Sequence, residues 1–351
     1  MIYRCIALFL TGVAALHAQV SPEALIEKGH FKRARVLAEQ RFHSDPKDPQ
    51  TLWLMSSVKQ AWKDYAPAID FAEKAVAADP KNARYHMRLA DALSDEAIRA
   101  SKLRQLGFAH RIKKEIETTL ALDPRNVEGM KWLMQYNLQA PALFGGDKTK
   151  ARAIPGQIMQ VDPVQGYFAQ VDLARFDKQN DRVEGLFRKA VEARPSSYEA
   201  HLGLGNYCAF QDIKKFEEAE SHAREALRID SDRVGAHNLL AAALVRQGKW
   251  TELDRALAEA EKAIPDNLTP YYRAAANCLS MNQELTRAEQ YIRKYLGQEP
   301  EPNMPGIAEA HWRLGRVLEK QNRKPEAISE YQTALKMDPE LPAKQDLKRL
   351  K

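Results

Sequence analysis

The sequence predicts an all-α protein that forms a solenoid of antiparallel helix pairs. Three observations support this: apolar residues recur with the spacing of amphipathic helices, strand-like alternation is absent, and prolines that would end helices return about every 34 residues. Most intervals fit one helix pair, so that pairs stack along the chain. One stop is missing between Pro195 and Pro265, where Ile229-Asp230-Ser231 stands in its place. The prolines stand at Asp45-Pro46, Asp79-Pro80, Asp123-Pro124, Asp162-Pro163, Arg194-Pro195, Ile264-Pro265, Glu299-Pro300 and Asp338-Pro339.

The first 18 residues are typical of a secretory signal peptide. Arg4 is their only charged residue, an apolar run extends from Cys5 to Leu16, and Ala18 offers a small residue for cleavage. The run is shorter than the roughly 20 residues of a membrane-spanning helix, although an uncleaved anchor is the alternative. We therefore predict a signal peptide at residues 1–18 and a periplasmic or secreted chain, with no stable membrane insertion after cleavage near Ala18.

Residues 19–163 are predicted to form an N-terminal array with long insertions. Its first unit is clipped, from Ser21 to Pro46, and the next unit has the regular length of 34 residues. The interval from Pro80 to Pro124 is 44 residues, and the excess predicts about three extra helical turns. The first array is therefore expected to be less regular than the part that follows.

A turn and an irregular helix are expected between residues 139 and 165. The excess length here falls in a loop ending at Gly145-Gly146-Asp147, where the glycines favour a turn and Asp147 can cap the next helix. Pro155-Gly156 lies well inside that helix and predicts a kink. We expect a weak joint at residues 140–165; a continuous solenoid with a local bend is the alternative.

Residues 164–339 are predicted to form a more regular C-terminal array, followed at 340–351 by a basic tail or a capping helix segment. In one repeat Gly248 permits a tight turn and Trp250 starts the second helix. Small residues at matching positions, such as Gly315 in a later repeat, allow the two helices of a pair to approach closely.

These motifs resemble the tetratricopeptide repeat family. The resemblance covers nearly all of the chain after the signal peptide, as about eight full units after the clipped first one. It implies a right-handed superhelical solenoid in which the first helices of the pairs line a concave groove. The family's usual first-helix tryptophan is often histidine here, at His86, His201, His237 and His311.

No pattern in the sequence indicates catalysis, and we predict no enzyme, no cofactor and no metal site. Histidines at equivalent positions of successive units lie about 10 Å apart, too far to bind one zinc ion, so we predict that the four first-helix histidines pack in the core. Cys208 and Cys278 fall two units apart. We expect them to be buried free thiols, because a disulfide cannot span roughly 20 Å.

The resemblance also implies that the fifth, ninth and thirteenth positions of each unit face the groove. Aromatic and Arg side chains there can anchor a partner segment, and Asn side chains can bond to its backbone. At each position, packing between units is the alternative to ligand contact. The predicted ligand-binding residues are Trp53, Met87, Lys131, Asn206, Phe210, Asn238, Arg246, Tyr272, Trp312 and Arg316.

The net charge of +6 is concentrated in one segment, where six basic residues and no acidic residue lie between positions 99 and 114. The segment predicts either a solvated helix face or a docking patch for an anionic partner, such as an acidic protein or lipid headgroups. Because we expect export, we predict no nucleic-acid partner. The six residues are Arg99, Lys102, Arg104, Arg111, Lys113 and Lys114.

Together these features predict an exported scaffold that binds other proteins or peptide segments in its groove and acts as an assembly adaptor. A hydrophobic fraction of 44% and only three cysteines exclude a disordered chain and a disulfide-stabilised scaffold. The alternative is an accessory or regulatory subunit of an envelope enzyme or polysaccharide-export system. Digestion of glycans would release partners in that case, whereas peptide capture would survive it.

Overall fold

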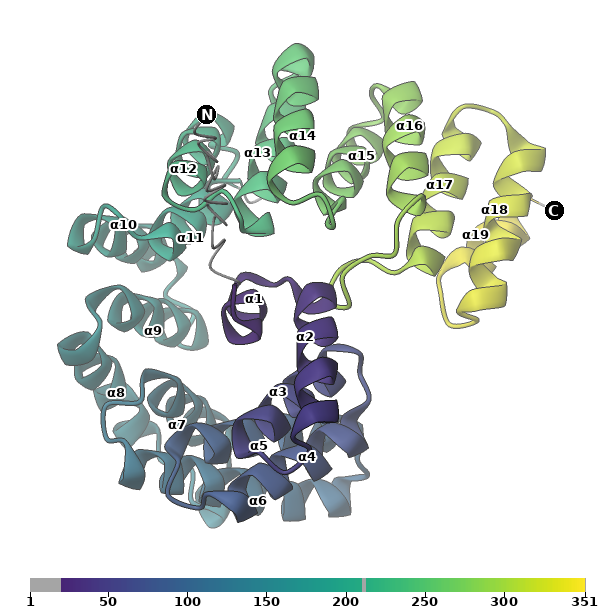
Figure 1. The fold of residues 1–351 in the computed structure, drawn as a ribbon. Coiled ribbons are helices and arrows are strands. Elements are labelled where there is room, and N and C mark those ends of the chain that lie inside the picture. The colour runs from purple at the N-terminus through teal and green to yellow at the C-terminus, as the bar shows by residue number, and fades with distance from the viewer. Residues whose placement is uncertain (1–19, 210–212, 351) are drawn as a thin grey trace, which may run out of the picture.

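A computed structural model describes residues 20–209 and 213–350, and every regular element within these ranges is a helix. Consecutive helices form antiparallel pairs from α1/α2 to α17/α18, as Figure 1 shows, and this confirms the predicted all-α solenoid. The helices are α1 Pro22–Lys28, α2 Phe31–Ser44, α3 Pro49–Ala61, α4 Tyr65–Ala78, α5 Ala83–Arg99, α6 Lys102–Leu122, α7 Val127–Gln139, α8 Lys148–Val161, α9 Pro163–Phe176, α10 Val183–Ala193, α11 Tyr198–Cys208, α12 Phe216–Ile229, α13 Val234–Arg246, α14 Trp250–Ala263, α15 Thr269–Met281, α16 Leu285–Leu296, α17 Ile307–Lys320, α18 Lys324–Met337 and α19 Ala343–Leu350, with short 3-10 turns η1 Ala142–Phe144 and η2 Asn180–Arg182.

Most second helices end where the prolines predict. The residue before each proline is the C-cap, and it is extended because the proline ring disfavours a helical conformation in the preceding residue. Asp162, for example, has φ −142° and ψ 107° after α8. One helix departs from this rule: α16 ends at Leu296, before Glu299-Pro300 is reached. The capping residues before proline are Asp45, Asp79, Asp123, Asp162, Arg194, Ile264 and Asp338.

The long intervals of the N-terminal array have structural counterparts. The interval between Pro80 and Pro124 holds α5, with 17 residues, and α6, with 21, which confirms the predicted elongated pair. The turn before α8 is also as predicted, because the Asp147 carboxylate accepts the N–H groups of Thr149 and Lys150 at 3.0 and 3.1 Å. The α8 helix itself continues through Pro155.

Buried side chains from α7, α8 and α9 form one apolar cluster across the segment where a weak joint is expected. Met134 on α7, Ile158 on α8 and Ala169 on α9 belong to it, and all three are fully buried. Pro155 is also buried, so packing on both sides holds this helix in place. The structure thus gives the segment a packed core, and a joint at residues 140–165 stays a prediction.

The apolar core changes character at α9. From Val171 on α9 to Ala343 on α19, one large cluster of buried side chains runs through the C-terminal half. The clusters of the N-terminal half are all smaller than this one, and two further small clusters lie in the C-terminal half. The predicted boundary between residues 163 and 164 lies at the start of this helix. At the other end α19 packs against the large cluster through Leu347 and Leu350, within the segment predicted as a tail or capping helix.

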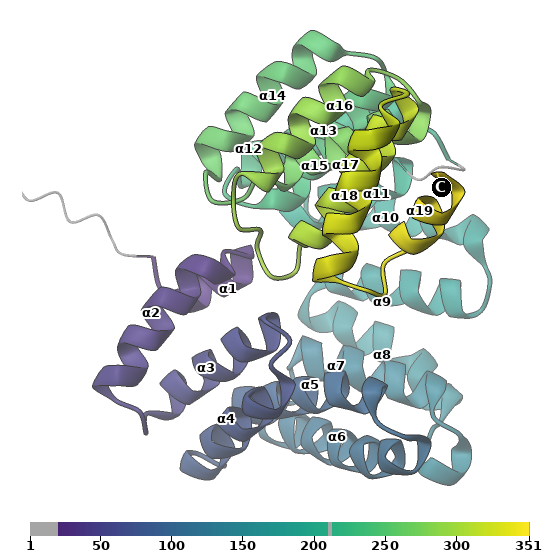
Figure 2. The same ribbon diagram turned by 90° about the vertical axis from the view of Figure 1, so that its right-hand side faces the viewer.

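The α1/α2 pair turns back toward the second half of the array. Figures 1 and 2 show it next to the loops that precede α13, α15 and α17. The Lys28 ammonium lies 3.4 Å from the carboxylates of Asp230 and Asp232, and the Lys32 ammonium donates to the carbonyl oxygen of Asp266 at 2.7 Å. We call this contact, between residues 28–33 and the loop residues 230–232, 266 and 299–301, the junction. It closes the solenoid on itself.

None of the helices in the described part of the chain is both long and apolar enough to cross a membrane. The predicted signal peptide at residues 1–18 lies outside the described residues. Cleavage near Ala18 and export therefore stay predictions.

Candidate functional site

The inner face of the arc is formed by the first helices of the pairs. In Figure 1, α9, α11, α13 and α15 lie on the inner side, and α10, α12, α14 and α16 lie on the outer side. Pockets on either side of α9 hollow this region. Because a scaffold of helix pairs presents its first helices along one extended surface, these pockets are the natural place to look for ligand binding.

The pocket between α9 and α11 has an aromatic floor. The ring centre of Phe187 lies 5.8 Å from that of Phe168 and 5.8 Å from that of Tyr207. A Cβ atom at Gly203 would approach Phe187 to 3.1 Å, so glycine leaves room for the rings. The pocket has a volume of about 870 Å³ and is lined by Arg175, Asn180, Val183, Phe187, Gly203, Asn206, Tyr207 and Ile213.

The polar groups of this pocket lie at its rim. Asn206 is exposed, and its amide can both donate to and accept from a peptide backbone. The Arg175 guanidinium lies 5.8 Å from the ring centre of Phe187, near the limit of a cation–π contact. An apolar floor with a few polar groups at the edge is the usual composition of a ligand pocket.

A second pocket lies on the other side of α9. It has a volume of about 690 Å³, and its walls come mainly from α6 and α7, with Trp132 and Tyr136 among them. Lys131 lines it and donates to the Gln165 side chain at 3.0 Å. Across from Lys131, Asp172 of α9 completes the lining. This pocket therefore offers one cation, one carboxylate and two aromatic rings.

Helix α9 joins the two pockets. Arg175 lines the pocket between α9 and α11 and Asp172 lines the second pocket, and residues three positions apart are neighbours on one helix face. Burial raises the pKa of Asp172, while Lys131 and Arg175 act in the opposite direction. The inner face around α9 is thus a continuous surface that carries charges of both signs between aromatic pockets.

Sequence profiles of the tetratricopeptide repeat match residues 49–82, 168–233 and 308–341. The first match covers α3 and α4, the second extends from within α9 to the loop after α12, and the third covers α17 and α18. The chain contains tetratricopeptide repeats. A search of curated protein sequences finds no match.

Solved structures with a related arrangement of helices include yeast Tom70, with a TM-score of 0.49 and 12% identity over 94% of this chain and 86% of that one. PilW, described as a widely conserved type IV pilus biogenesis factor, has a TM-score of 0.45 and 17% identity over 62% of this chain and 97% of its own. A tetratricopeptide repeat protein from Parabacteroides merdae has a TM-score of 0.42 and 15% identity over 86% and 98%.

Of the predicted groove residues of the tetratricopeptide array, Lys131 and Asn206 line the two pockets around α9. Arg316 is exposed on α17, and its guanidinium lies 5.5 Å from the ring centre of Trp312. Phe210 lies outside the described residues. The structure thus brings two of the predicted residues together beside α9 and places another pair on α17.

Two of the predicted groove residues are instead part of the core. Met87 is 3% exposed and Tyr272 is 1% exposed, because neighbouring repeats cover them. The Tyr272 hydroxyl donates to Glu309 at 2.6 Å and accepts from Arg313 at 2.7 Å, so its polar end is occupied as well. The expectation that these two side chains contact a ligand is therefore corrected: they hold adjacent repeats together.

The other predicted groove residues are partly buried, and three of them, Trp53, Arg246 and Trp312, stack on or hydrogen-bond to neighbouring side chains. Arg84 stacks on Trp53, with 3.8 Å between the guanidinium carbon and the ring centre. The Trp312 indole donates to Asp346 at 2.8 Å, and Arg246 donates to Asn277 at 3.0 Å. Asn238 has a buried side-chain oxygen with no hydrogen-bond partner among the described residues.

The basic segment spans the end of α5 and the first half of α6. Five of its six residues are exposed, and Lys113 is half-buried. Arg111 pairs with Glu73, and the Arg99 guanidinium lies 4.2 Å from the ring centre of Tyr65. Part of its charge is therefore balanced within the tetratricopeptide array.

An apolar hollow lies beside the basic segment. Leu106, Leu143 and Phe144 line it together with Lys113 and Lys114, and its volume is about 540 Å³. Leu143 is 87% exposed, which is unusual for a leucine of this size in a folded chain. Basic and apolar side chains are thus presented together at this edge.

Three of the four first-helix histidines and both cysteines are buried, as the sequence predicts. His86, His201 and His237 are buried, and His311 is half-buried. Cys208 and Cys278 are buried free thiols. Burial raises the pKa of Cys208 to about 11 and that of Cys278 to about 12, so both thiols are protonated at neutral pH.

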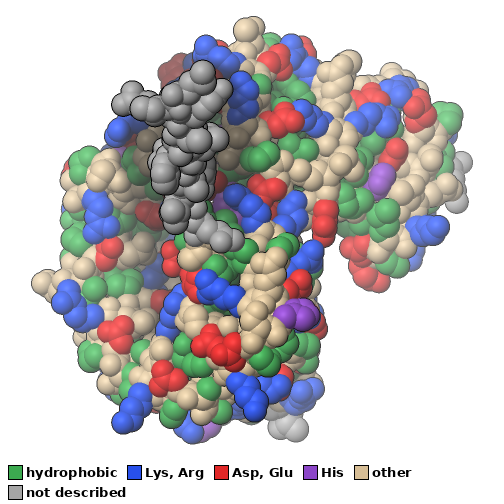
Figure 3. Space-filling view, in the orientation of Figure 1, with side chains coloured by type: hydrophobic (Ala, Val, Ile, Leu, Met, Phe, Trp, Pro, Cys, Tyr) green, Lys and Arg blue, Asp and Glu red, His purple; other side chains and the backbone are tan. Residues whose placement is uncertain are grey.

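No motif or repeat position in the sequence indicated the junction. Its charged residues are not among the groove residues or the basic segment predicted from the sequence, and they lie on loops far apart in the chain. Figure 3 shows Lys and Arg side chains next to Asp and Glu side chains across this face.

Burial raises the pKa of Glu301 to about 7. Within the described residues, the group with the spacing needed to bind a metal ion also lies here: His30, Asp266 and Glu301.

Proposed function

We propose that this protein is a scaffold that binds a peptide segment of a partner protein on the inner face around α9. The observation that carries the proposal is the pocket between α9 and α11, where an aromatic floor is rimmed by the exposed amide of Asn206. Aromatic anchors supply apolar contact at low entropic cost, and the amide can bond to a peptide backbone. The tetratricopeptide fold supports this role because it presents such pockets along one extended surface.

The experiment is a selection of random displayed peptides on the immobilised full chain, followed by fluorescence anisotropy with the enriched peptides. The double variant Tyr207→Ala and Asn206→Ala removes one of the aromatic rings of the pocket and the amide at its rim. We expect the enriched peptides to bind this variant at least about 30-fold more weakly, because loss of a hot-spot residue costs about 2 kcal/mol or more.

The matched control is Lys189→Ala combined with Glu192→Ala, on the outer helix α10, where both side chains are exposed. It should bind as the unmodified chain does. Circular dichroism must show the same helix content in both variants. If no peptide is enriched, or if enriched peptides bind the Tyr207 and Asn206 variant unchanged, the proposal is wrong.

We also propose that the basic segment docks on an anionic lipid surface. Its support is the exposed Leu143 beside Lys113 and Lys114, because apolar and basic side chains together favour an interface between water and lipid. Replacing all six basic residues by Gln should abolish sedimentation with phosphatidylserine-containing vesicles. Binding to poly-glutamate but not to vesicles would instead indicate an acidic polypeptide as the partner.

Finally, we propose that the chain is exported. The apolar run after Arg4 and the small residue at Ala18 support this. Expression of the full chain followed by cell fractionation and N-terminal sequencing provides the test. A periplasmic or secreted product that begins near Gln19 is expected, and an intact N-terminus on a cytoplasmic product would contradict it.

A further inference from the structure

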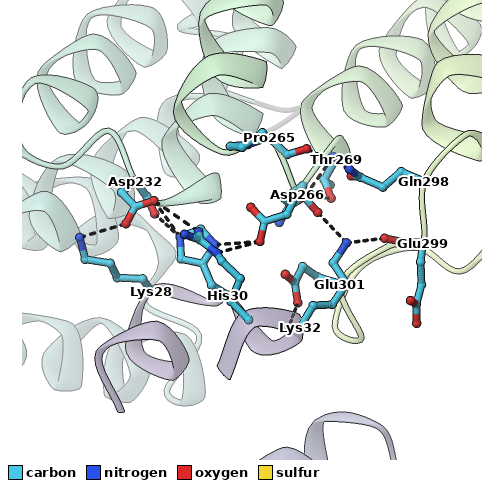
Figure 4. Close-up of polar contacts among 12 residues, drawn as sticks. Lys28, His30, Lys32, Asp232, Pro265, Asp266, Thr269, Gln298, Glu299 and Glu301 are labelled. Atoms are coloured by element: carbon cyan, nitrogen blue, oxygen red, sulfur yellow. Dashed lines mark hydrogen bonds and ion pairs between the residues drawn. The ribbon is translucent and has the colours of Figure 1, made fainter. Parts of the chain in front are cut away.

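Three metal-binding side chains meet at the junction, although they are distant in the sequence. His30 lies in the turn between α1 and α2, Asp266 lies in the loop before α15, and Glu301 lies in the loop before α17. One ligand atom from each lies within 4.8 Å of the other two. Ligands of one tetrahedral ion with bonds of about 2.0–2.2 Å lie roughly 3.3–3.6 Å apart, so small movements of the three side chains would bring these atoms onto one ion. Figure 4 shows the three side chains arriving from separate segments.

Each of the three side chains has one atom held by the protein. The ring Nε2 of His30 donates to the carbonyl oxygen of Asp232 at 2.7 Å. One carboxylate oxygen of Asp266 accepts from the Arg33 guanidinium at 2.9 Å, and one of Glu301 accepts from the backbone N–H of Lys32 at 3.0 Å. These bonds fix the orientation of all three groups.

The other polar atom of each side chain is buried without a partner. His30 Nδ1, Asp266 Oδ1 and Glu301 Oε1 are shielded from solvent, and none has a hydrogen-bond partner among the described residues. His30 and Glu301 are each 1% exposed. Burying a polar atom without a hydrogen-bond partner destabilises the fold, so three such atoms in one place call for a bound species.

The chemistry of the donors selects the species. A carbonyl oxygen can only accept, so Nε2 of His30 carries a proton, and in the neutral imidazole Nδ1 then has a lone pair. This arrangement, in which one ring nitrogen donates to a carbonyl and the other is free, is the usual one for a histidine that binds a metal. Imidazole together with carboxylates suits zinc and similar ions, whereas magnesium and calcium prefer oxygen ligands only.

We propose that His30, Asp266 and Glu301 bind a divalent transition-metal ion of the zinc class, which fastens the α1/α2 pair to the second half of the array. The ion satisfies the three buried atoms at once. It places positive charge beside the Glu301 carboxylate and beside the Asp266 carboxylate, which also pairs with Arg33. A remaining coordination position is available to water.

The test uses the full chain, stripped with a chelator and then titrated with zinc sulfate in competition with a chromophoric chelator. We expect one zinc ion per chain, confirmed by elemental mass spectrometry, and no comparable binding of magnesium or calcium. Glu301→Gln keeps the shape of the side chain but weakens it as a ligand, and His30→Ala removes a ligand. Each should lower zinc affinity by at least about 100-fold, because loss of a mere supporting hydrogen bond already costs 10- to 100-fold.

Two controls match these variants. Glu299→Gln changes an exposed carboxylate two positions before Glu301, and His43→Ala changes an exposed histidine at the far end of α2. Both should bind zinc as the unmodified chain does. If His30→Ala reduces the helix content, Glu301→Gln decides the question alone.

A second readout reports what the ion does to the fold. Hydrogen exchange of α1 and α2 should slow when zinc is added to the unmodified chain, and the Glu301→Gln variant should show no such change. The proposal is overturned if the unmodified chain binds no zinc, if Glu301→Gln binds it with unchanged affinity, or if bound zinc leaves the exchange of α1 and α2 unaltered.

Discussion

The histidines near the start of several first helices reach back to the loop that precedes their own helix. In three repeats Nε2 donates to a backbone carbonyl six positions earlier, at 2.9 or 3.0 Å. The imidazole thereby satisfies a carbonyl at the connection between repeats while its carbon atoms fill the core. This explains how a polar side chain can fill a buried position where the resemblance to tetratricopeptide repeats predicts a tryptophan. The pairs are His86 with Pro80, His201 with Pro195, and His237 with Ser231.

Burial lowers the pKa of His237, against the opposing effects of its bond to Ser231 and of Glu259. Below the ordinary histidine pKa of about 6.5, the unfolded chain takes up a proton that the folded chain resists. The contribution of His237 to the unfolding free energy should therefore be fully present above that pH. It should fall as the pH decreases below it, by at most about 1.4 kcal/mol per pH unit. Urea unfolding at several pH values measures the effect, and His237→Gln should reduce the slope. An unchanged slope would contradict the assignment.

Gly315 permits close packing of α17 on α18. A Cβ atom there would lie 2.6 Å from two ring carbons of Tyr331, whose ring is fully buried and whose hydroxyl donates to Glu319 at 2.7 Å. Because the ring cannot move aside freely, Gly315→Ala should lower the unfolding free energy by about 1–3 kcal/mol.

Gly156 provides the control for that substitution, since a Cβ atom on this α8 residue would meet nothing within 4 Å. Gly156→Ala should raise the unfolding free energy by about 0.5–1 kcal/mol through helix propensity alone. Urea midpoints of the two variants measure the difference. Equal effects would mean that crowding by Tyr331 is not the cause.

At the scale of the elements, Asp162 serves two helices at once. It ends α8, and its carboxylate caps α9 by accepting the N–H groups of Val164 and Gln165 at 2.9 and 3.1 Å. Asp162→Ala should cost about 0.5–2 kcal/mol of unfolding free energy, as the loss of an N-cap does.

Asp64 occupies the same cap position of α4 but makes no capping hydrogen bond there. Its ion pair with Lys59, at 3.3 Å, is largely exposed and should contribute little. Asp64→Ala is therefore expected to change thermal stability by much less than Asp162→Ala. Comparable losses would show that capping is not what Asp162 contributes.

The bounds of most helices were predictable because their causes are local. A proline acts on the residue before it, and a Gly-Gly-Asp turn acts on the next helix start, so both are visible in the sequence. The early end of α16 was not predicted, because the proline rule placed it at Glu299-Pro300. The helix ends instead at Leu296, with Gly297 as its C-cap. Continuation of α8 through Pro155 depends on burial against other helices, which a local motif does not report.

For the whole molecule, the candidate site was predictable only in part. Repeat positions identified Lys131 and Asn206, which line the pockets around α9. The same rule placed Met87 and Tyr272 in the groove, although neighbouring repeats bury them. The junction was missed because it depends on the curvature accumulated over many repeats. No single repeat contains that information.

Lys32 offers a test of the closed shape. Its ammonium donates to the carbonyl oxygens of Asp266 and Glu299 at 2.7 and 2.6 Å, from loops before α15 and α17. Lys32→Met leaves both without this donor, and a hydrogen bond to a charged group contributes roughly 1.5–3 kcal/mol. Small-angle X-ray scattering should show a larger radius of gyration at unchanged helix content.

Lys47→Met, in the exposed turn before α3, is the control and should leave the scattering profile unchanged. A Lys32→Met variant with the dimensions of the unmodified chain would show that the closed shape does not depend on this contact.

The junction also has a consequence for binding at a distance. Because residues 28–33 meet loops that follow several intervening repeats, a change in the pitch of those repeats must alter the distances across the contact. A partner that fits only one pitch is therefore thermodynamically coupled to the junction, and the coupling is reciprocal. Whatever tightens the junction would change partner affinity by the same factor by which the partner tightens the junction.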